Sequence, residues 1–121
     1  MLKKSLLLAI ATLLVGCQHP APSAPVHTIA AQIDQVANVL ASARFLRNAC
    51  QRSDILTEQP LQQRLLQEAR RRGWNSGAKQ WALLPQKSEE RYQALQGDSL
   101  PVTQKCQRLN QSTGAILRAL S

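Results

Sequence analysis

The residues of this chain best suited to chemistry are its three cysteines, Cys17, Cys50 and Cys106. A thiol can act as a nucleophile, ligate a metal, form a disulfide or carry a lipid, and its neighbours decide among these roles. The two histidines, His19 and His27, stand near Cys17 only, and no C-x-x-C pair is present. We therefore expect no metal site, no catalytic thiol and no cofactor other than a covalent lipid.

The other polar residues also lack a catalytic pattern. G-x-S-x-G, H-E-x-x-H and phosphate-binding loops are absent. The seven acidic residues show no acid–base pairing, and Glu89-Glu90 is typical of a solvated first helical turn. We expect a binding protein with no small-molecule substrate. The alternative is a small lipid-anchored enzyme, which a pocket containing a perturbed carboxylate would favour.

Cys17 ends a segment built like a secretory signal. Two lysines precede an apolar run over residues 6–14, which is too short to span a bilayer as a mature helix. The sequence L-V-G-C at 14–17 resembles the bacterial lipoprotein processing box, which implies a lipid on the Cys17 thiol and cleavage just before it. By the same resemblance Gln18, in place of Asp, favours the periplasmic face of the outer membrane. We predict a lipoprotein signal peptide over residues 1–16. The alternative is an ordinary signal peptide with a cysteine nearby.

A proline-rich spacer follows the predicted anchor. The stretch "QHPAPSAPVH" at 18–27 holds three prolines, which favour polyproline II backbone. At roughly 3.1 Å per residue, ten such residues reach about 30 Å from the bilayer. We predict a lipid-anchored spacer over residues 17–27 and a helical domain over 28–121.

Cys50 and Cys106 remain as a pair in an oxidising compartment. We predict a disulfide between them. It would close a loop of 56 residues, which the chain-entropy model values at about 4 kcal/mol. The alternative is two free thiols.

Four amphipathic segments are expected after the spacer, over about 28–50, 57–73, 88–97 and 99–121. Apolar residues recur in each at steps of three and four. We expect Thr28, Thr57 and Ser88 as N-caps and Gly73 as a C-cap. The expected core side of the last helix is Val102, Cys106, Leu109, Thr113, Ile116 and Leu120.

The predicted disulfide also orients these helices. Cys50 ends the first long helix and Cys106 lies in the second turn of the last, so the two helices should be antiparallel. Both cysteines fall on the apolar stripes of their helices, so the pattern and the crosslink agree. The sequence predicts an all-α fold, a small four-helix bundle with one disulfide.

Two sets of residues are candidates for partner binding. The helices carry more apolar residues than one core stripe needs, which indicates a groove for an amphipathic helix of another protein. The candidate groove residues are Val39, Phe45, Leu46, Trp81, Leu83, Leu84 and Leu117. The alternative is that the core uses them all. Arg70, Arg71 and Arg72 are candidates to contact an acidic partner or anionic lipid, or else they form a solvated last turn.

The net charge of the chain limits the classes of partner that it is expected to bind. The net charge is +8, and the first 16 residues carry two lysines and no acid, which leaves +6 for the rest. Export and the scarcity of aromatic residues argue against a nucleic-acid partner. A basic surface in the periplasm favours contact with an acidic protein segment or with anionic lipid head groups.

Four stretches together resemble the PulS/OutS-type pilotins, outer-membrane lipoproteins of the bacterial type II secretion system. They are "ARFLRNACQRSD" (43–54), "EARRRGW" (68–74), "LLPQKSEERYQAL" (83–95) and "KCQRLN" (105–110). The resemblance implies a helical bundle with a bridged cysteine pair. It also implies binding of the flexible C-terminal segment of the secretin subunit, which becomes helical in a groove. The lipid would then carry the secretin, protected from proteolysis and misassembly, to the outer membrane.

An alternative function shares the same anchor and fold. The chain could be a structural or modulatory periplasmic lipoprotein that binds another envelope complex. A crosslinking pull-down from envelopes separates the two hypotheses by the dominant partner.

The predicted anchor gives a first test. We expect Cys17→Ser to leave secretin binding intact while secretin accumulates at the inner membrane, because the cargo follows its lipid. Co-purification measures binding, and density-gradient fractionation measures location. Normal outer-membrane targeting by the variant would contradict the predicted role of Cys17.

Overall fold

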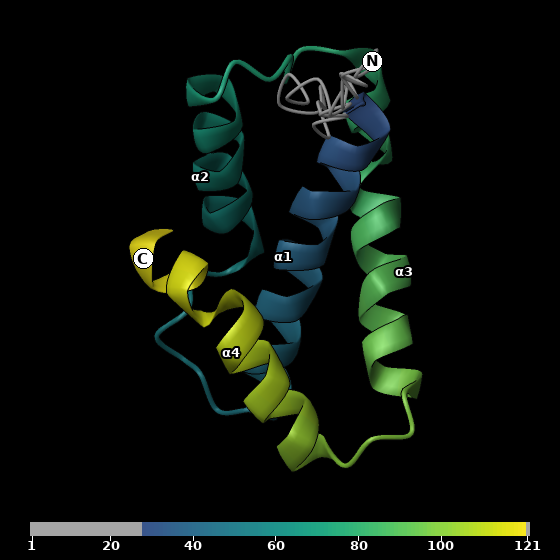
Figure 1. Cartoon of the computed structure of the whole chain (residues 1–121), viewed down its shortest axis with the longest axis vertical. Helices are drawn as coiled ribbons and strands as arrows, with labels where there is room; N and C mark the ends of the chain where they lie inside the picture. Colours follow the sequence, from purple (N-terminus) through teal and green to yellow (C-terminus); the bar gives the residue numbers. More distant parts are fainter. Residues whose placement is uncertain (1–27, 121) are drawn as a thin grey trace, which may run out of the picture.

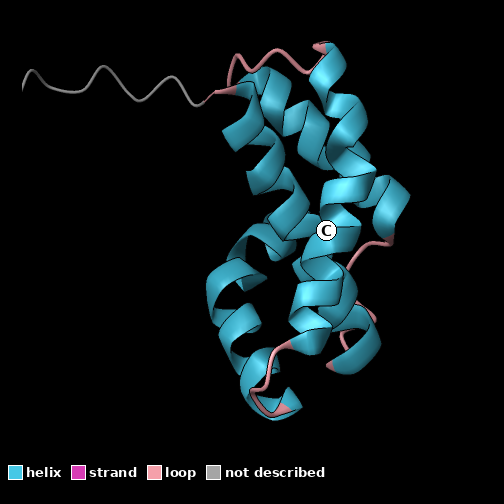
Figure 2. Cartoon of the chain, turned by 90° about the vertical axis from the view of Figure 1, so that its right-hand side faces the viewer, coloured by secondary structure: helices cyan, strands magenta, loops and turns pink. Residues whose placement is uncertain are grey.

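The computed structural model describes residues 28–120, and the predicted signal peptide, Cys17 and the spacer lie outside this range. The elements are α1 (Ile29–Ala49), α2 (Glu58–Arg71), the 3₁₀ helix η1 (Lys79–Leu83), α3 (Leu84–Gly97) and α4 (Val102–Leu120). Loops join these helices, and the described range contains no strand (Figure 2). None of the helices in that range is long and apolar enough to cross a bilayer. The predicted all-α four-helix bundle is confirmed.

Helix α1 is the central element. In Figure 1, α2 and α3 flank it and α4 crosses its C-terminal half. Its sequence suits this place, because small residues alternate with larger apolar ones around most of the helix. The alanines at 37, 41 and 43 are buried, which allows neighbouring helices to approach closely. Ile33, Val36 and Leu40 follow one another at steps of three and four and are buried as well.

The ends of α1 and α2 largely follow the predicted caps. Thr28 Oγ1 accepts a hydrogen bond from the Ala31 N–H at 3.2 Å. After α2, Gly73 has a φ of +80°, and its N–H donates to the Arg70 carbonyl. The Trp74 N–H reaches back to the Ala69 carbonyl at 2.9 Å, which completes a Schellman turn. Thr57 is the N-cap of α2, as predicted, although its side chain makes no capping hydrogen bond.

The start of α3 differs from the prediction. Ser88 is not an N-cap but lies one turn inside the helix, which begins at Leu84. Pro85 has no backbone N–H, and it is tolerated there because the N–H groups of the first helical turn have no partner within the helix. The preceding η1 runs directly into α3. Ser88 is buried, and its hydroxyl has no hydrogen-bond partner among the described residues.

The predicted disulfide joins Cys50 and Cys106, whose Cα atoms are 5.6 Å apart. It fixes the C-cap of α1 beside the second turn of α4. From this point α4 leans away from α1 toward α2 (Figure 1). Closing a loop of 56 residues stabilises the domain by about 4 kcal/mol on the chain-entropy model.

The loop after Cys50 is tied to the same end of α4. The Arg52 guanidinium donates to both Asp54 carboxylate oxygens, at 2.8 and 2.9 Å, and also to the Asn110 side chain. The hydrogen bond from Arg52 holds the pKa of Asp54 below its usual value. The C-x-R-S-D stretch at 50–54 is therefore structural, since it joins the end of α1 to α4.

The rotation of α4 about its axis is the main departure from the sequence pattern. Leu117, expected beside the core stripe, is only 1% exposed. Ile116 and Val102, expected in the core, are 46% and 51% exposed. The cause lies at Lys105, whose stem is buried.

The ammonium group of Lys105 sits at the C-terminal end of α3. Its Nζ donates to the Leu95 carbonyl at 2.7 Å and the Gln96 carbonyl at 3.3 Å. A cation is favoured at this end of a helix, where carbonyls lack partners. Nζ also lies 5.7 Å from the centre of the Phe45 ring. A lysine outside the predicted stripe is thus buried, as Leu117 is.

The rotation of α4 can be tested on adjacent residues. We expect Leu117→Ala to lower the free energy of unfolding by about 2–5 kcal/mol, because it opens a cavity in the core. Ile116→Ala is the matched control and should cost less than about 1 kcal/mol, since that side chain is half exposed. Urea unfolding followed by circular dichroism measures both. A larger loss for Ile116→Ala would mean that α4 is rotated as the sequence pattern predicted.

Candidate functional site

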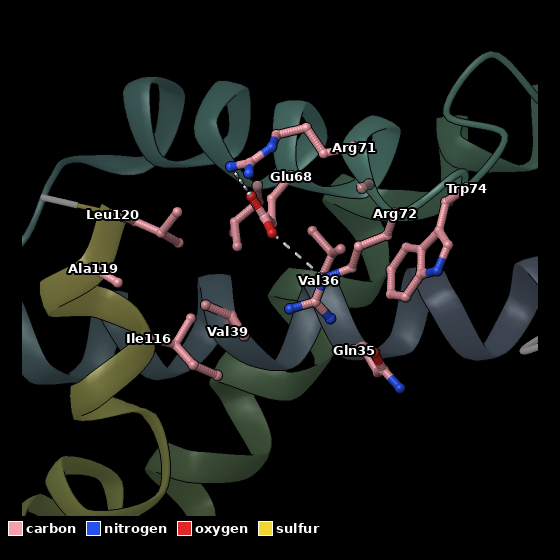
Figure 3. A pocket seen from close by; sticks show the side chains of 12 residues that line it. Gln35, Val36, Val39, Glu68, Arg71, Arg72, Trp74, Ile116, Ala119 and Leu120 are labelled. Atoms are coloured by element: carbon pink, nitrogen blue, oxygen red, sulfur yellow. Dashed lines mark hydrogen bonds and ion pairs between the residues drawn. The ribbon is translucent and has the colours of Figure 1, made fainter. Parts of the chain in front are cut away.

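A cleft of about 410 Å³ opens between α1, α2 and α4 (Figure 3). It is the candidate functional site. Its lining comprises Gln35, Val36, Val39, Leu65, Glu68, Ala69, Arg71, Arg72, Trp74, Ile116, Ala119 and Leu120.

The inner part of the cleft is apolar. Val36 of α1 and Leu65 of α2 are buried, and Val39 is half-buried beside them. The short side chains of Ala69 and Ala119 face the cleft from α2 and α4 and leave room between these helices. Such a surface can bury apolar side chains of a partner.

Two larger side chains bound the cleft at opposite places. Ile116 projects from the last turns of α4, as Figure 3 shows. Trp74 comes from the turn after α2, where the Schellman hydrogen bonds hold its backbone. Both side chains are partly exposed and so can change contacts without disturbing the core.

The charged side chains of the cleft all belong to the last turns of α2. Arg71 Nη1 lies 3.1 Å from Glu68 Oε2, and Arg72 Nε lies 3.6 Å from Glu68 Oε1. Both guanidinium groups are exposed, so these ion pairs are weak. Two cations share one carboxylate, which leaves a net charge of +1 at this rim.

The structure separates the seven predicted groove residues. Val39 lines the cleft, whereas Leu83 is 48% exposed elsewhere. Five belong to the core and do not line the cleft: Phe45, Leu46, Trp81, Leu84 and Leu117. Placing these five in an open groove is therefore a prediction that the structure corrects. The surplus of apolar residues is explained by α1, which is covered from several sides at once.

The predicted arginine cluster also divides. Arg71 and Arg72 line the cleft, but Arg70 does not, because successive residues of a helix point about 100° apart. All three are exposed. A contact to an acidic partner stays a prediction for Arg71 and Arg72.

Sequence reasoning missed several lining residues. Gln35, Glu68 and Trp74 were not assigned to a groove, and Ile116, Ala119 and Leu120 were either placed in the core or passed over. One signal was available at the end of α4, where "AILRAL" at 115–120 is apolar on two sides of the helix. One side faces the core through Leu117, and the other faces the cleft.

Outside the cleft, charged groups mainly connect helices. Arg44 pairs with Glu89 and lies 4.0 Å from the centre of the Tyr92 ring, and the hydrogen bond to Glu89 raises the pKa of Arg44. Burial lowers the pKa of Arg47, which donates to the Leu56 carbonyl at 2.7 Å. In the range 28–120, no group of three or more His, Cys, Asp or Glu residues is placed to hold a metal.

The comparisons identify the family. The model of the type II secretion system pilotin lipoproteins (PulS_OutS) matches residues 14–118. The chain belongs to this family. The pullulanase secretion protein PulS of Klebsiella pneumoniae is 37% identical over 89% of this chain and 86% of its own length. Pilotin OutS of Dickeya dadantii (strain 3937) is 33% identical over 88% of this chain and 84% of its own.

Solved pilotins share the fold. A chain from a complex of a pilotin with a secretin peptide matches with a TM-score of 0.71 and 31% identity, over 77% of this chain and 96% of its own. A chain from the Klebsiella pneumoniae type II secretion outer membrane complex, which contains PulD, PulS and the HR domain of PulC, matches with a TM-score of 0.68 and 31% identity. That match covers 75% of this chain and 96% of its own. This pilotin family consists of secretion lipoproteins and is not an enzyme family.

Proposed function

We propose that this pilotin binds the C-terminal segment of a type II secretin in the cleft between α1, α2 and α4. The observation that carries the proposal is this apolar cleft, in a fold matching that of a pilotin solved with a secretin peptide. The segment would bind as an amphipathic helix, with its apolar face on the inner part of the cleft.

The energetics favour an apolar contact of this kind. A flexible segment that folds on binding loses conformational entropy at a cost of about 2–5 kcal/mol. Burying apolar surface offsets that cost at about 25 cal/mol per Å². Val39 and Ile116 supply such surface while remaining accessible from outside.

The second half of the proposed function is delivery to the outer membrane. The L-V-G-C sequence and membership of a lipoprotein family support a lipid on Cys17. Stable attachment needs more than one acyl chain, since a single chain gives only reversible binding. A bound secretin subunit would then travel to the membrane where the anchor is sorted, with its terminal segment covered.

The proposal predicts that Ile116→Asp weakens binding of the secretin segment at least about tenfold, because the peptide would have to bury a charge or lose that contact. The probe is a synthetic peptide of the C-terminal segment of the type II secretin encoded in the same genome. Binding to residues 28–121 is measured by isothermal titration calorimetry. The solved pilotins match about three quarters of this chain over nearly their whole length, which supports using this region as a separate domain.

The matched control is Val102→Asp. Val102 lies on the same helix and is as exposed as Ile116, but it is outside the cleft. The control should bind with unchanged affinity, and circular dichroism should show that both variants fold. Equal affinity of the two variants would remove the cleft as the binding site. No binding of the peptide to the unmodified domain would contradict the proposed function itself.

A further inference from the structure

The rim of the cleft carries charged side chains, which the binding of an apolar helix face to the inner part of the cleft does not require. Arg71 and Arg72 approach a single carboxylate, Glu68, and these three are the charged residues of the lining. Among the residues that line the cleft, this arrangement leaves one positive charge in excess beside an apolar surface.

We propose that Arg71 and Arg72 bind a carboxylate of the incoming helix, which replaces Glu68 as their partner. This inference rests on the proposed function of the cleft. The carboxylate belongs to an acidic side chain in the last turns of the bound segment or to its C-terminus.

The chemistry of the rim suits a carboxylate. An arginine can donate two parallel hydrogen bonds to a carboxylate, and such charge-assisted pairs are stronger than neutral hydrogen bonds. The existing pairs to Glu68 are exposed, and exposed ion pairs contribute only about 0–1 kcal/mol, so exchanging them costs little. A bound helix would also exclude water from the rim, which strengthens the new pair.

The same arrangement fixes the direction of the bound helix. In Figure 3, Ile116, Ala119 and Leu120 gather at the α4 side of the cleft, whereas Arg72 and Trp74 lie at the other side. The C-terminal end of a helix carries a partial negative charge. This end of the segment therefore lies by Arg72 and Trp74, and its more N-terminal apolar residues contact α4.

The experiment is a double-mutant cycle measured by isothermal titration calorimetry on residues 28–121. The protein forms are unmodified, Arg71→Gln with Arg72→Gln, Glu68→Gln, and the control Arg70→Gln. The probe is the synthetic secretin segment described above. It is prepared unmodified, with a C-terminal amide, and with each acidic residue replaced by its amide counterpart.

The double arginine variant should bind the unmodified peptide about tenfold more weakly, the loss expected for one charge-assisted pair. Removing the carboxylate that the arginines bind should weaken the affinity of the peptide for the unmodified protein by the same factor. It should not weaken the affinity for the double arginine variant any further. The peptide form that shows this coupling identifies the source of the carboxylate. Arg70→Gln should bind like the unmodified protein, because Arg70 is exposed in the same turn but lies outside the cleft.

Two further binding measurements test the proposal. Glu68→Gln should tighten binding by about threefold, because an internal competitor worth less than about 1 kcal/mol is removed. Raising the salt concentration should weaken binding to the unmodified protein more than to the double arginine variant.

The outcomes separate this proposal from the function on which it rests. If the peptide binds and Ile116→Asp weakens it, but no peptide form is coupled to the arginines, the rim proposal is wrong and the function stands. If the peptide fails to bind the unmodified domain, both are wrong. An equal loss of affinity for Arg70→Gln would mean that the overall charge of the protein causes the effect. That result would overturn the assignment to Arg71 and Arg72.

Discussion

The rotation of α4 about its own axis is the constraint on which the site depends. The disulfide from Cys50 to Cys106 fixes where α4 starts, and the Lys105 ammonium on the last carbonyls of α3 fixes which side faces inward. Leu117 then enters the core and Ile116 faces the cleft. A helix turns by about 100° per residue, so a shift of one position would exchange these two roles.

The sequence predicted the helices and the crosslink but not this rotation. Periodicity and the oxidising compartment led to four helices and a bridge between Cys50 and Cys106 because both are local or compositional signals. Lys105 lies outside the predicted apolar stripe, and the sequence carries no sign that its head group meets the end of another helix. The predicted segment 88–97 begins too late because Pro85 is accommodated in the first turn of α3.

The site was only partly predictable because α1 is surrounded. Residues such as Phe45 and Leu46 lie outside a single apolar stripe, which is typical of a helix that borders a groove. A central helix is apolar on several sides for another reason, because other helices cover it there. The cleft lies where α2 and α4 leave α1 partly uncovered, and Val39 is the one predicted groove residue found there. The proposed anchor at Cys17 and the cleft belong to separate parts of the chain, so attachment to the membrane and capture of cargo could be changed independently.

The most direct test of the central claim is nuclear magnetic resonance of the ¹⁵N-labelled helical domain titrated with the secretin C-terminal peptide. The account predicts the largest shift changes at the amides of Val39 and Ile116 and at the indole of Trp74. The exposed amides of α3 around Gln93 should change little, and the peptide should gain helical shifts. Changes centred on α3, or a peptide that stays unfolded when bound, would contradict it.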